Sequence, residues 1–215
     1  MCSHYEVPDN NSLFQYYGAK PNSSYSSNLW PGGRGAFLRA DPQTDPYDDA
    51  VQKIEALTGI FGLLPSWVKD IKFARRTFNA RSESVSTKPS FRYAWRQGQH
   101  CIIPATAIYE PDWRSGKSVA TRITRTDGEP LSIAGLWDRW RSPSGEVIYS
   151  YTMLTINADG HAVMKNLHRP EAEKRMVVIL PQSNINQWLL AKPEHSIAFL
   201  KQYPAGRLST DPHNS

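Results

Sequence analysis

The spacing of apolar residues predicts an amphipathic helix over residues 44–59. Val51, Ile54 and Leu57 recur at helical intervals there, and Gly59 follows them as a helix terminator. Acidic residues precede this apolar stripe, where they complement the positive end of a helix.

Beyond residue 100 the pattern changes to short segments rich in β-branched and aromatic residues, which predicts strands. From Val147 to Met153 apolar residues alternate with a period of two, as in a half-buried strand. Ser115-Gly116 and Asp127-Gly128 are turn signals between neighbouring strands. The predicted strands cover residues 100–103, 119–125, 131–137, 147–156 and 175–180.

This mixture predicts an α+β fold: a single domain with a curved antiparallel β-sheet or barrel-like core and peripheral helices. A second short helix is expected over residues 184–191, capped by Ser183. Residues 10–35 are rich in Asn, Ser, Tyr, Pro and Gly and are expected to be mostly irregular. We expect the domain to span residues 1–207 and residues 208–215 to form a disordered tail.

The 215 residues include two cysteines, Cys2 and Cys101. Two cysteines give neither a disulfide framework nor a zinc-binding spacing, so we expect a reduced, cytoplasmic protein without a metal or other cofactor. No apolar run is long enough to cross a membrane, and the first residues lack the pattern of a signal peptide.

Positive charge is concentrated in the middle of the chain. Residues 72–125 carry eleven basic and three acidic side chains, whereas residues 126–215 carry nine of each. Phe91, Tyr93 and Trp95 interleave with arginines in the basic segment. Cations beside aromatic rings are typical of surfaces that bind single-stranded nucleic acid, although a solvated basic face has the same composition.

Cys2 directly follows the initiating Met. Methionine aminopeptidase usually removes a Met that precedes a residue this small, which would leave Cys as the N-terminal residue. An amine and a thiol on adjacent carbons condense with an aldehyde: the amine forms an imine, and the sulfur then closes a thiazolidine. An α-amino pKa of about 7.7–8.0 leaves part of the amine unprotonated near neutral pH.

Three further polar residues occur beside apolar segments. Asn79 follows a basic stretch, Glu110 ends an apolar strand, and His168 follows Leu167. Each has an ordinary structural explanation as a turn amide, an exposed strand end or a structural imidazole. A partly buried carboxylate at Glu110 could, however, take up and release protons near pH 7.

Several stretches together resemble the SRAP (SOS response-associated peptidase) family, whose members sense abasic sites in single-stranded DNA. Their order and spacing match the family across roughly residues 59–181, more than half of the chain. Besides Met1-Cys2 they are FGLLPSW (61–67), FNARSES (78–84), HCIIPATAIYE (100–110), IAGLW (133–137), TMLTINAD (152–159) and LHRPEAEKRMVVIL (167–180).

The resemblance implies catalytic roles for four residues. Cys2 would be the nucleophile, bonded through amine and sulfur to the ring-opened abasic sugar. Asn79 would orient the amine and the sugar. Glu110 would relay protons during ring opening and imine formation, and His168 would assist ring opening and reversal of the crosslink.

The resemblance also implies contacts to DNA. Arg81 would bind phosphate, Trp67 would pack against DNA near the lesion, and Thr155 would lie near a backbone phosphate. The chain departs from the family where Ser3-His4 follow Cys2 in place of Gly-Arg and where Pro111 replaces the Trp after Glu110. It also departs where six residues separate His168 from Arg175-Met176.

The function implied by the resemblance is a covalent sensor of abasic sites in single-stranded DNA, an abasic site processing protein of the DNA damage (SOS) response. A thiazolidine crosslink to Cys2 would protect the lesion, and we expect a monomer that binds neither metal nor membrane. Two other interpretations fit the residues. One is a cysteine peptidase, acting on itself or on other proteins, with His168 as base and Asn79 as orienting group. The other is a non-catalytic module that binds single-stranded nucleic acid.

Overall fold

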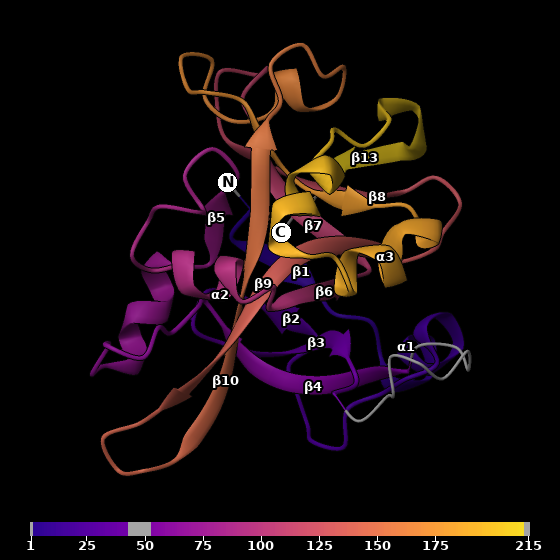
Figure 1. The fold of residues 1–215 in the computed structure, drawn as a ribbon. Helices are drawn as coiled ribbons and strands as arrows, with labels where there is room; N and C mark the ends of the chain where they lie inside the picture. Colours follow the sequence, from indigo (N-terminus) through magenta and orange to yellow (C-terminus); the bar gives the residue numbers. More distant parts are fainter. Residues whose placement is uncertain (1, 43–52, 213–215) are drawn as a thin grey trace.

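β-Strands dominate the computed structural model of the chain, which describes residues 2–42 and 53–212 (Figure 1). The strands are β1 (His4–Glu6), β2 (Asn28–Leu29), β3 (Arg34–Ala40), β4 (Ile54–Phe61), β5 (Asn79–Arg81), β6 (His100–Ala105), β7 (Ala107–Asp112), β8 (Val119–Arg125), β9 (Leu131–Arg141), β10 (Val147–Asn157), β11 (Arg175–Val177), β12 (Ile179–Leu180) and β13 (Leu208–Pro212). The α-helices are α1 (Asn10–Tyr17), α2 (Arg92–Arg96) and α3 (Ile185–Leu189). The 3-10 helices are η1 (Ile71–Arg76), η2 (Met164–Asn166), η3 (Gln182–Asn184), η4 (Pro193–Phe199) and η5 (Ala205–Arg207).

Five strands close into a barrel in the order β10–β4–β3–β6–β9, because β9 also pairs with β10. The β9–β10 hairpin is built from strands of eleven residues each, and β10 runs through almost the full height of Figure 1. This architecture confirms the predicted α+β fold with a barrel-like core and peripheral helices. The pairing is mixed, however, since β10 runs parallel to β4 and to β5.

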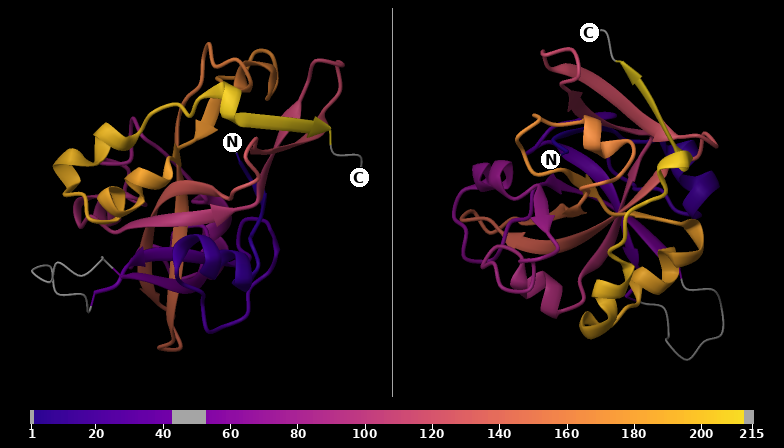
Figure 2. Two further views of the ribbon diagram at one scale, coloured as in Figure 1. Left: turned by 90° about the vertical axis from the view of Figure 1, so that its right-hand side faces the viewer. Right: turned by 90° about the horizontal axis from the view of Figure 1, so that it is seen from above.

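A second sheet has five strands in the order β13–β8–β7–β1–β2. Its strand β1 is short but is paired on both sides: His4 lies opposite Tyr109 of β7, and Tyr5 lies opposite Leu29 of β2. The start of the chain is therefore an interior strand, next to the strand that carries Glu110. Figure 2 shows β8 and β13 together at one edge of the molecule.

An aromatic core joins the two sheets. The hydroxyls of Tyr5 in β1 and Tyr151 in β10 form a 2.6 Å hydrogen bond between buried rings, which satisfies both polar groups. Gly35 makes room for this pair, because a Cβ at that position would lie 2.3 Å from the Tyr151 hydroxyl. The N-terminal strand is thus attached to the barrel through its interior as well as through the sheet.

The predicted helix over residues 44–59 is wrong where the structure describes it. Residues 54–59 belong to strand β4, and residues 44–52 lie outside the described residues. β4 pairs with β3 from Ile54 to Ile60 and with β10 at its end. These sheet contacts outweigh the helical spacing of Ile54 and Leu57, since local propensity is a weak constraint beside tertiary pairing.

The region 10–35 is less irregular than expected, because it includes α1, β2 and the first residues of β3. α1 is capped by Asp9, whose Oδ1 accepts a 2.8 Å hydrogen bond from the Ser12 amide. The predicted helix over residues 184–191 corresponds to α3. Ser183 does not cap it, because its hydroxyl contacts the Asn184 side chain, 3.3 Å away, and Asn184 precedes the helix.

Residues 208–212 form β13 where we expected the disordered tail to begin. β13 pairs with β8 from Leu208 opposite Arg125 to Pro212 opposite Thr121. This pairing covers the outer edge of β8, whose backbone groups would otherwise be open to solvent or to another chain. Among the described residues, no helix is both long enough and apolar enough to cross a membrane.

Candidate active site around Cys2

Cys2 lies just before β1 and is 1% exposed. The Asn79 side chain reaches it from β5: Asn79 Nδ2 donates a 2.7 Å hydrogen bond to the Cys2 carbonyl oxygen. β5 is placed there by its parallel pairing with β10, in which Asn79 lies opposite Met153. Two segments 77 residues apart in sequence therefore meet through a side chain that holds the backbone of Cys2.

Glu110 and His168 form a buried pair in the same site. His168 Nε2 lies 2.9 Å from Glu110 Oε2, and the two side chains are 9% and 3% exposed. Glu110 comes from β7, the neighbour of β1, and its carboxylate also acts electrostatically on the Cys2 thiol. The structure thus brings Cys2, Asn79, Glu110 and His168 together.

His168 has a left-handed backbone conformation with φ at 65°, the one non-glycine residue in the described part of the chain with a positive φ. Such a conformation costs roughly 1–2 kcal/mol for a residue with a Cβ. Its amide donates a 2.7 Å hydrogen bond to the Pro111 carbonyl, and Asp112 forms an isolated β-bridge with Leu167. Strain maintained by such contacts is typical of functional positions.

The Cys2 thiol is a neutral group at physiological pH. Burial raises its pKa well above the ordinary range, and the Glu110 carboxylate raises it further. The sulfur lies 3.5 Å from the His4 carbonyl oxygen. A reaction at this sulfur therefore needs a base that removes its proton.

The residues proposed to contact DNA are in different surroundings. Arg81 is half exposed and pairs with Glu173 at 2.9 Å. Thr155 is 1% exposed, and its hydroxyl accepts a 3.1 Å hydrogen bond from Arg175. Trp67 is 55% exposed and packs edge-on against Phe73. Arg81 and Trp67 are therefore open to a ligand, whereas Thr155 is enclosed.

Arg175 is a further buried residue of this region that the sequence motifs did not identify as a site residue. Arg175 is 2% exposed, pairs with Glu83 and Glu173 at 2.8 Å each, and reaches the Thr155 carbonyl at 2.8 Å. It ties β11 to Glu83, which lies in the segment after β5, two residues from Arg81. Its position as a basic residue at the start of an apolar strand is the sequence signal that could have identified it.

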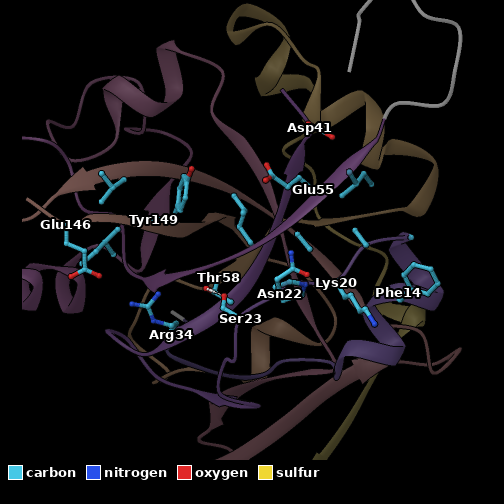
Figure 3. A pocket seen from close by; sticks show the side chains of 18 residues that line it. Phe14, Lys20, Asn22, Ser23, Arg34, Asp41, Glu55, Thr58, Glu146 and Tyr149 are labelled. Atoms are coloured by element: carbon cyan, nitrogen blue, oxygen red, sulfur yellow. Dashed lines mark hydrogen bonds between the residues drawn. The ribbon is translucent and has the colours of Figure 1, made fainter. Parts of the chain in front are cut away.

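No group of three or more His, Cys, Asp or Glu side chains in the described residues is arranged to hold a metal ion. A separate hollow of about 610 Å³ is open on the side of β3, β4 and β10 (Figure 3). Its lining includes Arg34, Glu55, Thr58 and Tyr149, whereas Cys2 and the three residues around it are not part of it. The candidate active site is therefore the buried cluster at the start of the chain.

The fold and the site together define the class of protein. It is a mixed β-barrel with a site centred on Cys2, whose backbone is held by the Asn79 amide beside the Glu110–His168 pair. The chain belongs to the SOS response associated peptidase (SRAP) family, which it matches over residues 1–214. The family resemblance inferred from the sequence is therefore confirmed.

Curated relatives of this chain are abasic site processing proteins. The chain is 34% identical over 149 residues to abasic site processing protein YoqW of Bacillus subtilis (strain 168), an alignment that covers 67% of this chain and 63% of the relative. It is 30% identical over 151 residues to abasic site processing protein HMCES of Xenopus tropicalis, with coverages of 60% and 43%. The chain thus spans less than two thirds of the length of these relatives.

Solved structures share the fold. A crystal structure of a Bordetella bronchiseptica protein has a TM-score of 0.89 and 46% identity, and the match covers 100% of both chains. A Bacteroides thetaiotaomicron protein has a TM-score of 0.82 at 20% identity, with coverages of 99% and 92%, and supports the fold alone.

Proposed function

We propose that this chain is a covalent sensor of abasic sites in single-stranded DNA, which it captures as a thiazolidine after removal of Met1. The observation that carries the proposal is the 2.7 Å hydrogen bond from Asn79 to the Cys2 carbonyl, beside the Glu110–His168 pair. In this proposal the hydrogen bond from Asn79 fixes the backbone of Cys2 and so orients its amine for the reaction. The names of the relatives point to the same lesion.

The reaction joins both nucleophiles of Cys2 to one carbon. The sugar opens to an aldehyde, and the amine attacks C1′ to give a carbinolamine. Its hydroxyl is protonated and leaves as water, which forms the imine. The sulfur then adds to the imine carbon and the nitrogen takes up a proton, so one water is lost and two bonds to C1′ are made.

The surroundings of Cys2 support a division of roles among its neighbours. The raised pKa of the Cys2 thiol keeps it protonated, so the amine attacks first and the sulfur follows once a base accepts its proton. Glu110 and His168, whose Oε2 and Nε2 atoms lie 2.9 Å apart, would divide the acid and base steps between them. Asn79 Oδ1 is buried and has no partner among the described residues, which leaves it as an acceptor for the amine.

Affinity for DNA comes, in this proposal, from the basic segment rather than from base recognition. Arg81 and other exposed arginines would contact phosphates near the lesion, and Trp67 would pack against the strand. Binding should therefore weaken with salt. Thr155 would act through Arg175 and β5, since its hydroxyl is enclosed. We propose that the protein acts as a monomer in the cytoplasm and requires no cofactor.

The contacts of Asn79 favour aldehyde capture over peptide hydrolysis. In a Cys–His–Asn peptidase the amide orients the histidine. Here the Asn79 amide donates to the Cys2 backbone, and the His168 imidazole lies against Glu110. The non-catalytic interpretation leaves the buried Glu110–His168 pair and the strained His168 backbone without a role.

The test is a crosslinking assay with a labelled single-stranded oligonucleotide that contains one abasic site. Wild-type protein should give an adduct that survives denaturation without a reductant. Cys2→Ser should bind the DNA and give an adduct only when borohydride traps the imine. Cys101→Ala, which changes a cysteine buried in β6, should behave as wild type.

Two results would overturn the proposal. One is a stable adduct formed by Cys2→Ser at the wild-type rate. The other is retention of Met1 in protein that still crosslinks, shown by intact mass spectrometry, because the amine would then be blocked as an amide.

A further inference from the structure

Three aromatic rings form a parallel stack beside Cys2. The His4 ring lies between Trp30 and Tyr109, with centroids 4.1 Å from each and interplanar angles of 8° and 13°. The three residues come from neighbouring strands or their ends: β1 carries His4, β7 carries Tyr109, and Trp30 directly follows β2. The stack therefore crosses the sheet, and Trp30 is its outermost ring.

Polar contacts hold the inner rings. His4 Nε2 contacts Asn28 Oδ1, and the Tyr109 hydroxyl donates to Glu6. Glu6 in turn accepts hydrogen bonds of 3.0 and 2.7 Å from the Arg122 guanidinium. Because the His4 and Tyr109 rings are fixed in this way, the stack is organised before any ligand binds. This lowers the entropic cost of binding a ligand on it.

The outermost ring of the stack, Trp30, is open to solvent. Trp30 is 57% exposed although His4 covers one of its faces, whereas Tyr109 at the inner end is 8% exposed. Large exposed aromatic surfaces that continue a fixed stack are typical platforms for nucleobases, because every base has a π-face.

The surroundings of Trp30 carry positive charge. A Cβ on Gly32, two residues further on, would lie 3.5 Å from Arg75 Cγ and 3.6 Å from Arg75 Nε, so the exposed Arg75 side chain packs over this turn. Arg34, four residues after Trp30 at the start of β3, is also exposed. A strand of DNA that placed a base on Trp30 would thus have cations near its phosphates.

We propose that Trp30 is the stacking platform for the nucleobase next to the abasic site. Cys2 and His4 are two residues apart, which separates their Cα atoms by at most about 7 Å. A sugar bonded at Cys2 therefore has its neighbouring nucleotide, rather than a distant one, within reach of the stack. The inference rests on the proposed function, since it takes Cys2 as the position of the lesion.

The experiment measures equilibrium binding of oligonucleotides that carry a tetrahydrofuran residue, an abasic analogue that lacks the C1′ hydroxyl and cannot form an imine. In matched oligonucleotides a second tetrahydrofuran replaces the nucleotide on the 5′ side, on the 3′ side or on both. Trp30→Ala should weaken binding about 5- to 150-fold when both neighbouring bases are present. Trp30→Phe should recover most of this loss.

The loss of affinity in Trp30→Ala must depend on the nucleobase next to the tetrahydrofuran residue. Removal of one neighbouring base should weaken wild-type binding by a similar factor and abolish the difference between wild type and Trp30→Ala. Phe14→Ala, which removes an equally exposed ring on α1, should change nothing. An unchanged affinity of Trp30→Ala, or a loss that persists when both neighbouring bases are absent, would overturn the platform.

The two proposals fail separately. The tetrahydrofuran assay does not use the chemistry of Cys2, so wild-type protein that binds these oligonucleotides but never crosslinks a true abasic site would refute the sensor and leave the platform standing. Conversely, Trp30→Ala should react with free 2-deoxyribose at the wild-type rate, and a slower reaction would show that Trp30 acts only on the position of Cys2.

Discussion

Replacement of Asn79 by Ala tests whether the backbone of Cys2 must be held for crosslinking. The change deletes the 2.7 Å hydrogen bond to the Cys2 carbonyl and leaves that oxygen without its donor in a residue that is 1% exposed. An unsatisfied buried polar group costs about 1–3 kcal/mol. If this free energy is lost in the transition state, the crosslinking rate falls about 5- to 150-fold.

The assay is single-turnover crosslinking to abasic single-stranded DNA, with protein in excess and concentrated enough to bind all of the DNA. Under these conditions the rate reports the chemical step and not affinity. Asn79→Asp keeps the shape but offers an acceptor to an acceptor, so it should be at least as slow as Asn79→Ala. Asn11→Ala, a change at an exposed residue of α1, is the matched control.

One result would refute this reasoning. If Asn79→Ala retains the wild-type melting temperature and crosslinks within twofold of the wild-type rate, the hydrogen bond to Cys2 is a structural contact without a part in the reaction. A variant that binds DNA normally, stays folded and reacts slowly would show that Asn79 acts on the reacting residue.

Three further predictions concern stability. His168→Gly should be about 1 kcal/mol more stable than His168→Ala in thermal unfolding, because φ is 65° at this position, whereas both should lose crosslinking equally. Burial lowers the pKa of His100 to about 4, so unfolded protein binds a proton that folded protein does not; stability present above pH 6.5 should fall by about 2 kcal/mol at pH 5 in urea titrations, and His100→Gln should flatten this slope. Gly62→Ala should cost about 3 kcal/mol or more, since φ is 126° and the Cβ would lie 1.9 Å from the Ala74 carbonyl oxygen, whereas Gly116→Ala, with no atom within 4 Å, should cost about 1 kcal/mol; equal losses would contradict the steric argument.

The strands could be predicted from sequence where their own residues decide the outcome. β8, β9 and β10 are rich in β-branched and aromatic residues, and all three predicted segments are strands. β4 could not, because Ile54 and Leu57 also fit a helix, and the outcome depends on β3 and β10 as partners. Closure of the barrel through β9 and β10 is likewise a property of long-range pairing.

The sequence motifs identified the candidate site residues, but they did not predict the contacts that these residues make. Nothing in the spacing of Asn79 and Cys2 indicates that the amide donates to a backbone carbonyl rather than to an imidazole. The left-handed backbone of His168 is also hidden, since it depends on the contacts of its loop with Pro111 and Asp112. Chemistry that depends on residue type can be predicted from the sequence, whereas chemistry that depends on the orientation of side chains can be inferred only from the folded structure.

The departures from the family pattern fit together in the structure. The β1–β7 ladder ends at His4 opposite Tyr109, and Pro111 lies two residues beyond Tyr109 without an amide hydrogen to extend the ladder toward Cys2. The Cys2 carbonyl is instead satisfied by Asn79, and His4 is fixed by the rings on either side. Cys2 therefore lies outside the ladder. It is held by the Asn79 side chain and, two residues further on, by the ring stack that fixes His4. In this position Cys2 lies beyond the end of the β1–β7 ladder, which leaves its amine available for the proposed condensation.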